Sequence, residues 1–198
     1  MHVDKIVMEE KTKKEIKSWV VFLIIIGTLW ITGLHRPIIA QVNRLVLWTG
    51  VIQPNTKSSE SNTKAGTLSL LNEDGQVVTL DSFEGKIVFV NFWATWCPPC
   101  IAEMPGIENL YQSADHENIN FAIISLDDNF EKAKAFKKKK GYTFPIFTLA
   151  SQLPPELEAD VLPTTYVLDK NGVIKMKHDG MAKYDSNSFK KYLNDLVR

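Results

Sequence analysis

The sequence predicts a layered α/β or α+β domain behind an N-terminal membrane-spanning helix. Three observations lead to this prediction. Residues 19–34, "WVVFLIIIGTLWITGL", carry no charge. From residue 67 onward, short apolar runs typical of strands alternate with helix-like segments. The 198 residues leave room for one ordinary domain and an appendage.

Composition excludes several classes of protein. Lysine plus arginine equals aspartate plus glutamate, 23 each, so no net field attracts nucleic acid, and we expect no nucleic-acid partner. Two cysteines in the whole chain exclude a disulfide-dense scaffold and a zinc site built from two CxxC pairs.

The first element is expected to be a transmembrane signal anchor over residues 18–35, preceded by a cytoplasmic tail over residues 1–17. Sixteen uncharged residues of helix cover about 24 Å, which is short of a bilayer core of about 30 Å. Snorkelling by Lys17 and Arg36 extends that reach. The alternative is a cleaved signal peptide, but its best cut, after Ala40, has Ile38 where a small residue belongs.

The flanking charges predict the orientation of the anchor. Four lysines lie close before it, at positions 11, 13, 14 and 17, whereas only Arg36 and Arg44 lie close after it. By the positive-inside rule the N-terminus stays in the cytoplasm. We therefore expect a single-pass protein of the cell membrane whose catalytic domain lies in the periplasm or the cell exterior.

Residues 36–66 are expected to form an amphipathic segment and a flexible tether. Apolar residues recur at helical spacing after the anchor, at Ile38, Val42, Leu45 and Val46 or Trp48. Two interpretations remain open: an interfacial or partner-facing helix, and a helix that packs on the folded domain. Residues 53–66, rich in serine and asparagine, are typical of a flexible linker.

Residues 67–198 are expected to form the folded domain. Its first two strands, over 67–71 and 76–80, are joined at Asp74-Gly75, a favoured hairpin dipeptide. The elements expected after them are a strand over 86–93, a helix over 98–113, a strand over 119–125, a lysine-rich helix ending at Gly141, a strand over 144–149, a short helix over 154–161, a hairpin over 164–180 turning at Asn171-Gly172, and a helix over 185–197.

The segment "NFWATWCPPC" holds the only two cysteines, Cys97 and Cys100, and three roles are conceivable for them. A structural disulfide closing so short a ring contributes about 2 kcal/mol, less than the roughly 3 kcal/mol of a 15-residue loop. A metal site needs more ligands, and His116 and His178 are far away in sequence. Redox chemistry is the third role.

Helix geometry favours the redox role. If a helix begins at Pro98, Cys97 becomes its cap, where the positive end of the helix dipole stabilises a thiolate. Cys100 lies three residues further on the same face and can close a disulfide with Cys97. Cys97 is then the attacking thiolate and Cys100 the resolving thiol. The two prolines between them remove two amides that would otherwise face the Cys97 sulfur.

The longer segment "FVNFWATWCPPCIAEMP" resembles the active-site segment of the thioredoxin-like proteins of the TlpA/ResA group, and the likeness extends over residues 67–198. The resemblance implies an α/β thioredoxin-like fold: a central mixed sheet flanked by helices, with an N-terminal β-hairpin extension. The family pattern places a tryptophan before the first cysteine, here Trp96, and a proline within the active-site helix, here Pro105. It also places a cis-proline loop opposite the dithiol, which "VLPTT" matches with Leu162 and Pro163. The resemblance implies that Trp96, Leu162 and Pro163 contact the substrate.

One position departs from thioredoxins proper, which carry a buried aspartate on the strand before the motif. Asn91 stands there and cannot accept a proton. Glu103 stands where TlpA/ResA-like proteins keep an active-site glutamate, three residues after Cys100 and on the same helical face. We expect Glu103 to exchange a proton with the resolving thiol if burial raises its pKa.

The function implied by the resemblance is an extracytoplasmic thiol-disulfide oxidoreductase. Such proteins reduce disulfides in exported proteins such as apocytochrome c and are recharged by a membrane electron donor. No cofactor beyond the redox-active Cys97–Cys100 disulfide and no metal is expected. Two alternatives remain, a copper- or zinc-handling thiol module and a thiol peroxidase; the P-x-x-x-T-x-x-C peroxidase signature would need threonine and proline where Ala94 and Val90 stand.

Overall fold

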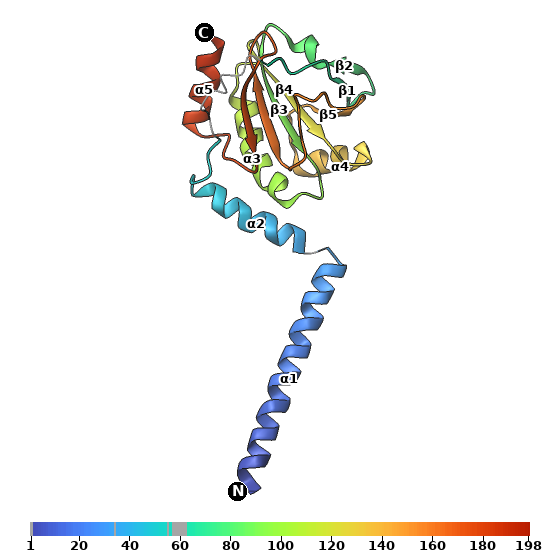
Figure 1. Cartoon of the computed structure of the whole chain (residues 1–198), viewed down its shortest axis with the longest axis vertical. Coiled ribbons are helices and arrows are strands. Elements are labelled where there is room, and N and C mark those ends of the chain that lie inside the picture. The colour runs from blue at the N-terminus through green and yellow to red at the C-terminus, as the bar shows by residue number, and fades with distance from the viewer. Residues whose placement is uncertain (1, 34, 55, 57–62) are drawn as a thin grey trace. The chain divides into compact units, whose positions relative to one another are not determined.

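The computed structural model describes residues 2–33, 35–54, 56 and 63–198, and it divides into two compact units, residues 1–38 and 39–198. The first unit contains helix α1 (His2–Ile31) and the start of helix α2 (His35–Trp48), which crosses into the second unit. The second unit contains the sheet (Figure 1).

Helix α1 carries a long run of exposed apolar side chains. From Trp19 to Ile26 every side chain is apolar, and all but Ile26 are at least 49% exposed. The hydroxyl of Thr28 donates to the carbonyl of Ile24 (2.9 Å), so this polar side chain is satisfied within the helix. Within the part of the chain whose residues are described, no helix has both the length and the apolar character that crossing a membrane requires. The anchor over residues 18–35 stays a prediction.

The described part of the second unit forms a seven-stranded sheet in the order β2-β1-β5-β4-β3-β6-β7. Strands β3, β4 and β5 are parallel to one another, and the other pairs are antiparallel, which makes the sheet mixed as the resemblance implied. The strands are β1 (Ser69–Asn72), β2 (Val77–Thr79), β3 (Ile87–Trp93), β4 (Ile119–Ser125), β5 (Ile146–Leu149), β6 (Thr164–Leu168) and β7 (Ile174–Asp179). The other elements are the 3-10 helix η1 (Leu80–Phe83) and the helices α3 (Pro98–Ser113), α4 (Phe130–Lys140) and α5 (Asn187–Val197).

Strand β3 lies in the interior of the sheet, between β4 and β6, and all seven of its residues are buried. Its side chains alternate between two apolar clusters, one on each face. Phe89 and Trp93 pack with residues of α3, α4 and α5, whereas Val90 and Phe92 pack on the opposite face with β1 and the segment before it. Asn91 therefore points to the same side as Phe89, toward α3.

The predicted turns are confirmed. Gly75 has a φ of 80° in the β1–β2 hairpin, and Gly141 ends α4 with a φ of 70°, both in the left-handed region that glycine adopts without steric cost. In the β6–β7 hairpin the amide of Gly172 donates to the carbonyl of Asp169 at 2.9 Å.

The prediction of a short helix over residues 154–161 is wrong, because this segment consists of turns, bends and irregular backbone. Pro154 and Pro155 have no N–H group, and one turn bond, from the Leu157 amide to the Pro154 carbonyl, is made. The Leu157 side chain is buried, and the Glu158 carbonyl accepts a bond from the Tyr166 hydroxyl at 2.7 Å. The Glu158 carbonyl is therefore used in a tertiary contact with β6 and not in a helical hydrogen bond. The sequence also missed η1, which directly follows β2.

Parts of the segment before the predicted domain pack on it. Ala40 and Leu47 of α2 are buried, and the amide of Lys183 donates to the carbonyl of Ile52 at 3.1 Å. Further along, the Ala65 amide donates to the Gly172 carbonyl at 3.0 Å. Residues 55 and 57–62 of the predicted tether lie outside the described residues.

Candidate active site

Cys97 and Cys100 lie at the start of α3 and are joined by a disulfide with a Cα–Cα distance of 5.3 Å. Cys97 is the cap residue, with extended backbone, and Pro98 begins the helix, as the sequence predicted. The Cys100 amide donates to the Cys97 sulfur at 3.3 Å. Because Pro98 and Pro99 have no N–H group, this amide is the one that the first helical turn offers to the sulfur.

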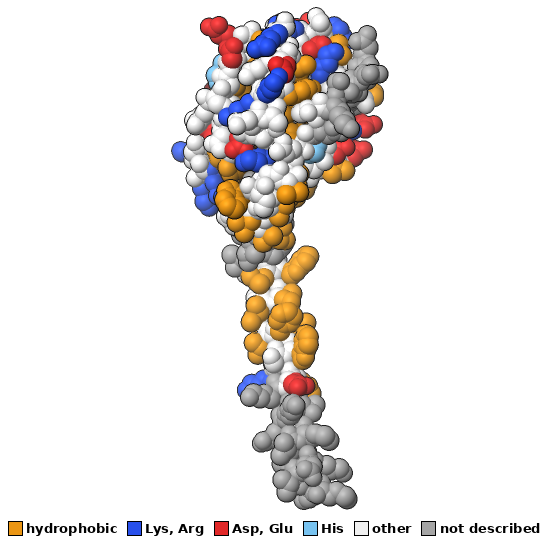
Figure 2. All heavy atoms as spheres, turned by 90° about the vertical axis from the view of Figure 1, so that its left-hand side faces the viewer, with side chains coloured by type: hydrophobic (Ala, Val, Ile, Leu, Met, Phe, Trp, Pro, Cys, Tyr) orange, Lys and Arg blue, Asp and Glu red, His pale blue; other side chains and the backbone are white. Residues whose placement is uncertain are grey.

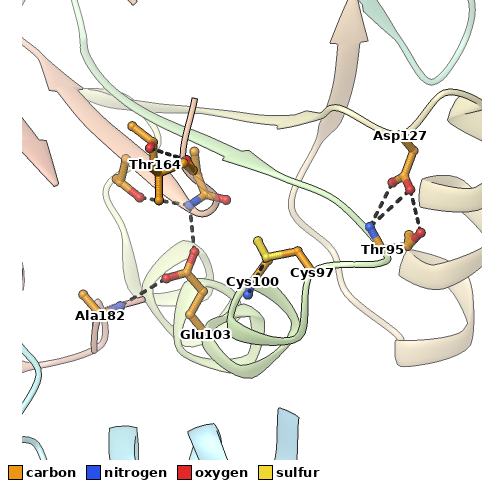
Figure 3. Close-up of a disulfide and its surroundings, with 10 residues drawn as sticks. Thr95, Cys97, Cys100, Glu103, Asp127, Thr164 and Ala182 are labelled. Atoms are coloured by element: carbon orange, nitrogen blue, oxygen red, sulfur yellow. Dashed lines mark hydrogen bonds between the residues drawn. A yellow bond between two sulfur atoms is a disulfide. The ribbon is translucent and has the colours of Figure 1, made fainter. Parts of the chain in front are cut away.

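Glu103 lies one turn beyond Cys100 on the same helix and is 1% exposed (Figure 3). Its Oε1 accepts a hydrogen bond from the Asn91 side-chain amide at 2.9 Å, and its Oε2 accepts one from the Ala182 backbone amide at 3.2 Å. Loss of hydration on burial raises the pKa of Glu103 to about 8, although these two bonds act in the opposite direction. The carboxyl group can therefore hold or release a proton near neutral pH.

Asn91 belongs to a buried polar chain behind Glu103. Its Nδ2 also donates to the Thr165 hydroxyl at 2.9 Å, and the Tyr184 hydroxyl donates to the same Thr165 oxygen at 2.7 Å. The Oδ1 atom of Asn91 is buried without a hydrogen-bond partner among the described residues. Asn91 thus donates a hydrogen bond to the Glu103 carboxyl group, and the role of Glu103 as a proton acceptor stays a prediction.

A second carboxylate holds the loop that precedes the dithiol. Asp127, just after β4, accepts hydrogen bonds from the backbone amide (3.0 Å) and the hydroxyl (2.6 Å) of Thr95 (Figure 3). It also accepts one from the Ser125 hydroxyl at 2.8 Å. Asp127 is 6% exposed. These contacts connect the loop carrying Trp96 and Cys97 to the end of the neighbouring strand.

The residues expected to contact substrate lie in two segments. Trp96 is 49% exposed beside Cys97, and Leu162 packs against the apolar cluster that contains both cysteines. The Leu162–Pro163 peptide bond is cis, as the resemblance implied. The carbonyl of Pro163 accepts a bond from the Gly180 amide at 2.8 Å. Their role in substrate binding stays a prediction.

Pro105 lies inside α3, as expected. Within the described residues, no group of three or more histidine, cysteine, aspartate or glutamate side chains is placed to hold a metal ion.

Sequence reasoning missed Asp127, Thr165, Tyr184 and Ala182. For Asp127 a signal existed, because it directly follows strand 119–125 and the ends of parallel neighbouring strands meet at one edge of a sheet. The other three come from segments more than 60 residues beyond Glu103, and no local pattern marks them.

Comparison with known proteins places the chain in a family. The sequence model of the Redoxin family matches residues 57–196. This match covers well over half of the chain, which therefore belongs to the Redoxin family.

Individual relatives confirm the resemblance to the TlpA/ResA group. The chain is 34% identical over 125 residues to the thiol-disulfide oxidoreductase ResA of Oceanobacillus iheyensis, covering 63% of this chain and 64% of the relative. It is 34% identical over 119 residues to the thioredoxin-like protein YneN of Bacillus subtilis, covering 59% of this chain and 70% of the relative. The chain thus spans less than two thirds of the length of that ResA protein.

A solved structure supports the fold. The crystal structure of StoA from Bacillus subtilis superposes with a TM-score of 0.56 at 21% identity, covering 67% of this chain and 98% of StoA. The second unit therefore has the thioredoxin-like fold.

Proposed function

We propose that this chain is a membrane-anchored, extracytoplasmic thiol-disulfide oxidoreductase that reduces disulfides of exported proteins, with apocytochrome c as a candidate substrate. The observation that carries the proposal is the cysteine pair at the N-terminus of α3 with the buried carboxyl group of Glu103 one turn away. The thiol-disulfide oxidoreductases among its relatives support it.

The first step is attack by the reduced Cys97 thiolate on one sulfur of a substrate disulfide. An S–S bond forms between Cys97 and the substrate, and the substrate's other sulfur leaves as a thiolate. The dipole of α3 and the Cys100 amide favour the thiolate form of Cys97, because both present positive charge to its sulfur.

The second step is attack by Cys100 on the Cys97 sulfur of this mixed disulfide. Cys100 must lose its proton, and Glu103, with a pKa near 8, is matched to a thiol of pKa about 8.5. The substrate leaves with both its sulfurs reduced, and the Cys97–Cys100 disulfide remains. Two electrons have passed from the dithiol to the substrate. A membrane electron donor then restores the dithiol.

Anchoring is supported by the uncharged stretch over residues 19–34 and by the exposed apolar side chains of α1. The lysines before this stretch support, by the positive-inside rule, a cytoplasmic N-terminus and a catalytic domain on the outside, where protein disulfides persist.

The reduction potential of the Cys97–Cys100 pair tests the direction of transfer. A reductase is expected to have a potential near that of thioredoxin, about −270 mV, whereas a value near −120 mV would identify an oxidant and contradict the proposal. Substrates are captured with Cys100→Ala, which forms the mixed disulfide but cannot resolve it. Cys97→Ala is the matched control, because it lacks the attacking thiolate and should capture none.

A further inference from the structure

Helix α2 has two apolar surfaces that face different ways. Ala40 and Leu47, seven residues apart, are buried on one face. The opposite side, here called the outer face, comprises Ile39, Val42, Leu45 and Val46 with the following Trp48 and Val51; their exposed fractions range from 38% to 81%. Figure 2 shows hydrophobic side chains gathered at the surface of the folded unit. Val42, Leu45, Val46 and Trp48 of the outer face are among the residues whose helical spacing was noted in the sequence.

The inner side of α2 is held in place by the catalytic domain. Arg44 and Leu47 line a cavity of about 170 Å³, together with Glu103 and Pro105 of α3. Trp48 also borders this cavity, but most of its side chain is exposed with the outer face. After α2, the Ile52 carbonyl accepts from the Lys183 amide, and Gln53 accepts a 2.6 Å hydrogen bond from the Ser188 hydroxyl. Because the inner side of α2 packs on the domain, its outer face is left exposed within the second unit.

Charge indicates what covers the outer face. No aspartate or glutamate occurs between Glu15 and Glu60, and the charged residues of α2 itself, Arg36 and Arg44, are both basic. An aliphatic face with an exposed tryptophan, in a stretch of chain that carries only basic charges, is the composition of a helix that lies in the headgroup region of an anionic bilayer. A surface made for a basic protein partner would carry acidic residues.

Chain connectivity indicates the same occupant. Three residues, 32–34, separate α1 from α2. Even fully extended they span only about 10 Å, which is comparable to the thickness of the headgroup layer on one side of a bilayer. A bilayer that takes up the apolar part of α1 therefore lies within reach of α2.

We infer that the outer face of α2 lies on the surface of a lipid bilayer containing anionic lipids, so that one helix both contacts the membrane and covers the cavity beside Glu103. The inference rests on the proposed anchoring by α1. It assigns residues 39–51 a role in orienting the dithiol at the membrane surface.

The test is quenching of Trp48 fluorescence by brominated lipid in the full-length chain. The parent variant carries Trp19→Phe and Trp30→Phe, so that α1 contributes no signal. It is reconstituted into vesicles of phosphatidylcholine and phosphatidylglycerol, with or without bromine on the acyl chains. We expect bromination to lower the emission of this parent, and a further Trp48→Phe substitution to abolish that loss.

A matched pair of surface substitutions sharpens the result. Leu45→Glu places a charge on the outer face and is expected to abolish the quenching, whereas Val77→Glu, on exposed strand β2, should leave it unchanged. Quenching that is absent, or equal with and without Trp48, overturns the inference. A Trp48 emission that changes with protein concentration and not with bromination also overturns it, and assigns the face to a second copy of the chain.

Flotation of the same samples after a high-salt wash separates the two proposals. If the chain floats with the vesicles but Trp48 is not quenched, the anchoring proposal stands and the contact of the outer face with the bilayer is overturned. If the chain does not float, the anchoring proposal is overturned. Quenching is then also absent, so the inference about the outer face is overturned as well. Thiol-disulfide exchange, measured in detergent, reports on the enzymatic part independently of both.

Discussion

Glu103 is the residue on which the proposed chemistry most depends. Its carboxyl group is buried, yet it keeps two hydrogen-bond donors, Asn91 and the Ala182 amide. Burial without any donor would hold the group protonated far above neutral pH, whereas full hydration would leave it ionised. The combination leaves its pKa at about 8, close to the ordinary pKa of a cysteine thiol, about 8.5.

Replacing this carboxyl group should change how thiol exchange depends on pH. For Glu103→Gln we expect the inflection near pH 8 that comes from the carboxyl group to disappear, and the resolving step to slow by about 10²-fold or more, because glutamine cannot take the Cys100 proton. Stopped-flow exchange with a small disulfide across pH 6–10 measures both effects. The exposed Glu117→Gln is the control; a Glu103→Gln profile matching that of wild type would end the assignment.

At the scale of elements, the dithiol loop is held between two neighbouring strands. β3 ends at Trp93 and β4 at Ser125, and their parallel pairing brings the loops after them to the same edge of the sheet. Asp127 uses this proximity to accept two bonds from Thr95. The loop that leads into α3 is therefore positioned by a carboxylate 32 residues beyond Thr95.

Removing this contact should destabilise the fold, because it leaves the Thr95 amide and the Ser125 hydroxyl without their acceptor. We expect Asp127→Ala to lower the free energy of unfolding by about 3 kcal/mol, as for the loss of buried hydrogen bonds to a charged group. The neighbouring Asp128→Ala should leave it nearly unchanged, because Asp128 makes only an exposed ion pair with Lys132. Urea unfolding of the oxidised proteins compares the two variants. Equal effects would show that the contacts of Asp127 with Thr95 and Ser125 do not stabilise the fold.

At the scale of the whole molecule, the raised pKa of Glu103 links folding to pH. In the unfolded chain the group titrates near 4.5, and in the fold near 8. Between these values the unfolded state binds fewer protons, so stability falls as pH rises. His178 acts in the opposite direction, since burial lowers its pKa, but only up to its unfolded value of 6.5. From pH 6.5 to 8 the opposing contribution of His178 fades, so Glu103 dominates the dependence of stability on pH.

In that window we expect the free energy of unfolding of the oxidised wild-type protein to fall with pH, by at most about 1.4 kcal/mol per pH unit. Glu103→Gln should remove the slope, because glutamine does not titrate. Urea titrations at pH 6.5, 7.2 and 8 measure it. Parallel lines for the two proteins would mean that Glu103 is not the group that couples folding to pH.

Local patterns in the sequence were enough for much of the fold. Continuous apolar runs marked β3 and β4, glycines marked the hairpin turns, and Pro98 after Cys97 marked the start of α3, because these features act within a few residues. The prediction for residues 154–161 was wrong because a local pattern does not include distant contacts. The two prolines lack amides, and the segment bonds to β6 instead of forming a helix.

The sequence by itself determined the cysteine pair, its place at a helix N-terminus and the position of Glu103 one turn away, since all three follow from spacing along one helix. Only the tertiary structure decided what surrounds them. The hydrogen bonds of Glu103 with Asn91 and Ala182, and that of Asp127 with Thr95, join segments that are 12 to 79 residues apart. It also decided that α2 turns Ala40 and Leu47 inward and leaves its more apolar face outside. The physical reason is that pKa, burial and the choice of packed face depend on neighbours brought by the fold, which no local pattern encodes.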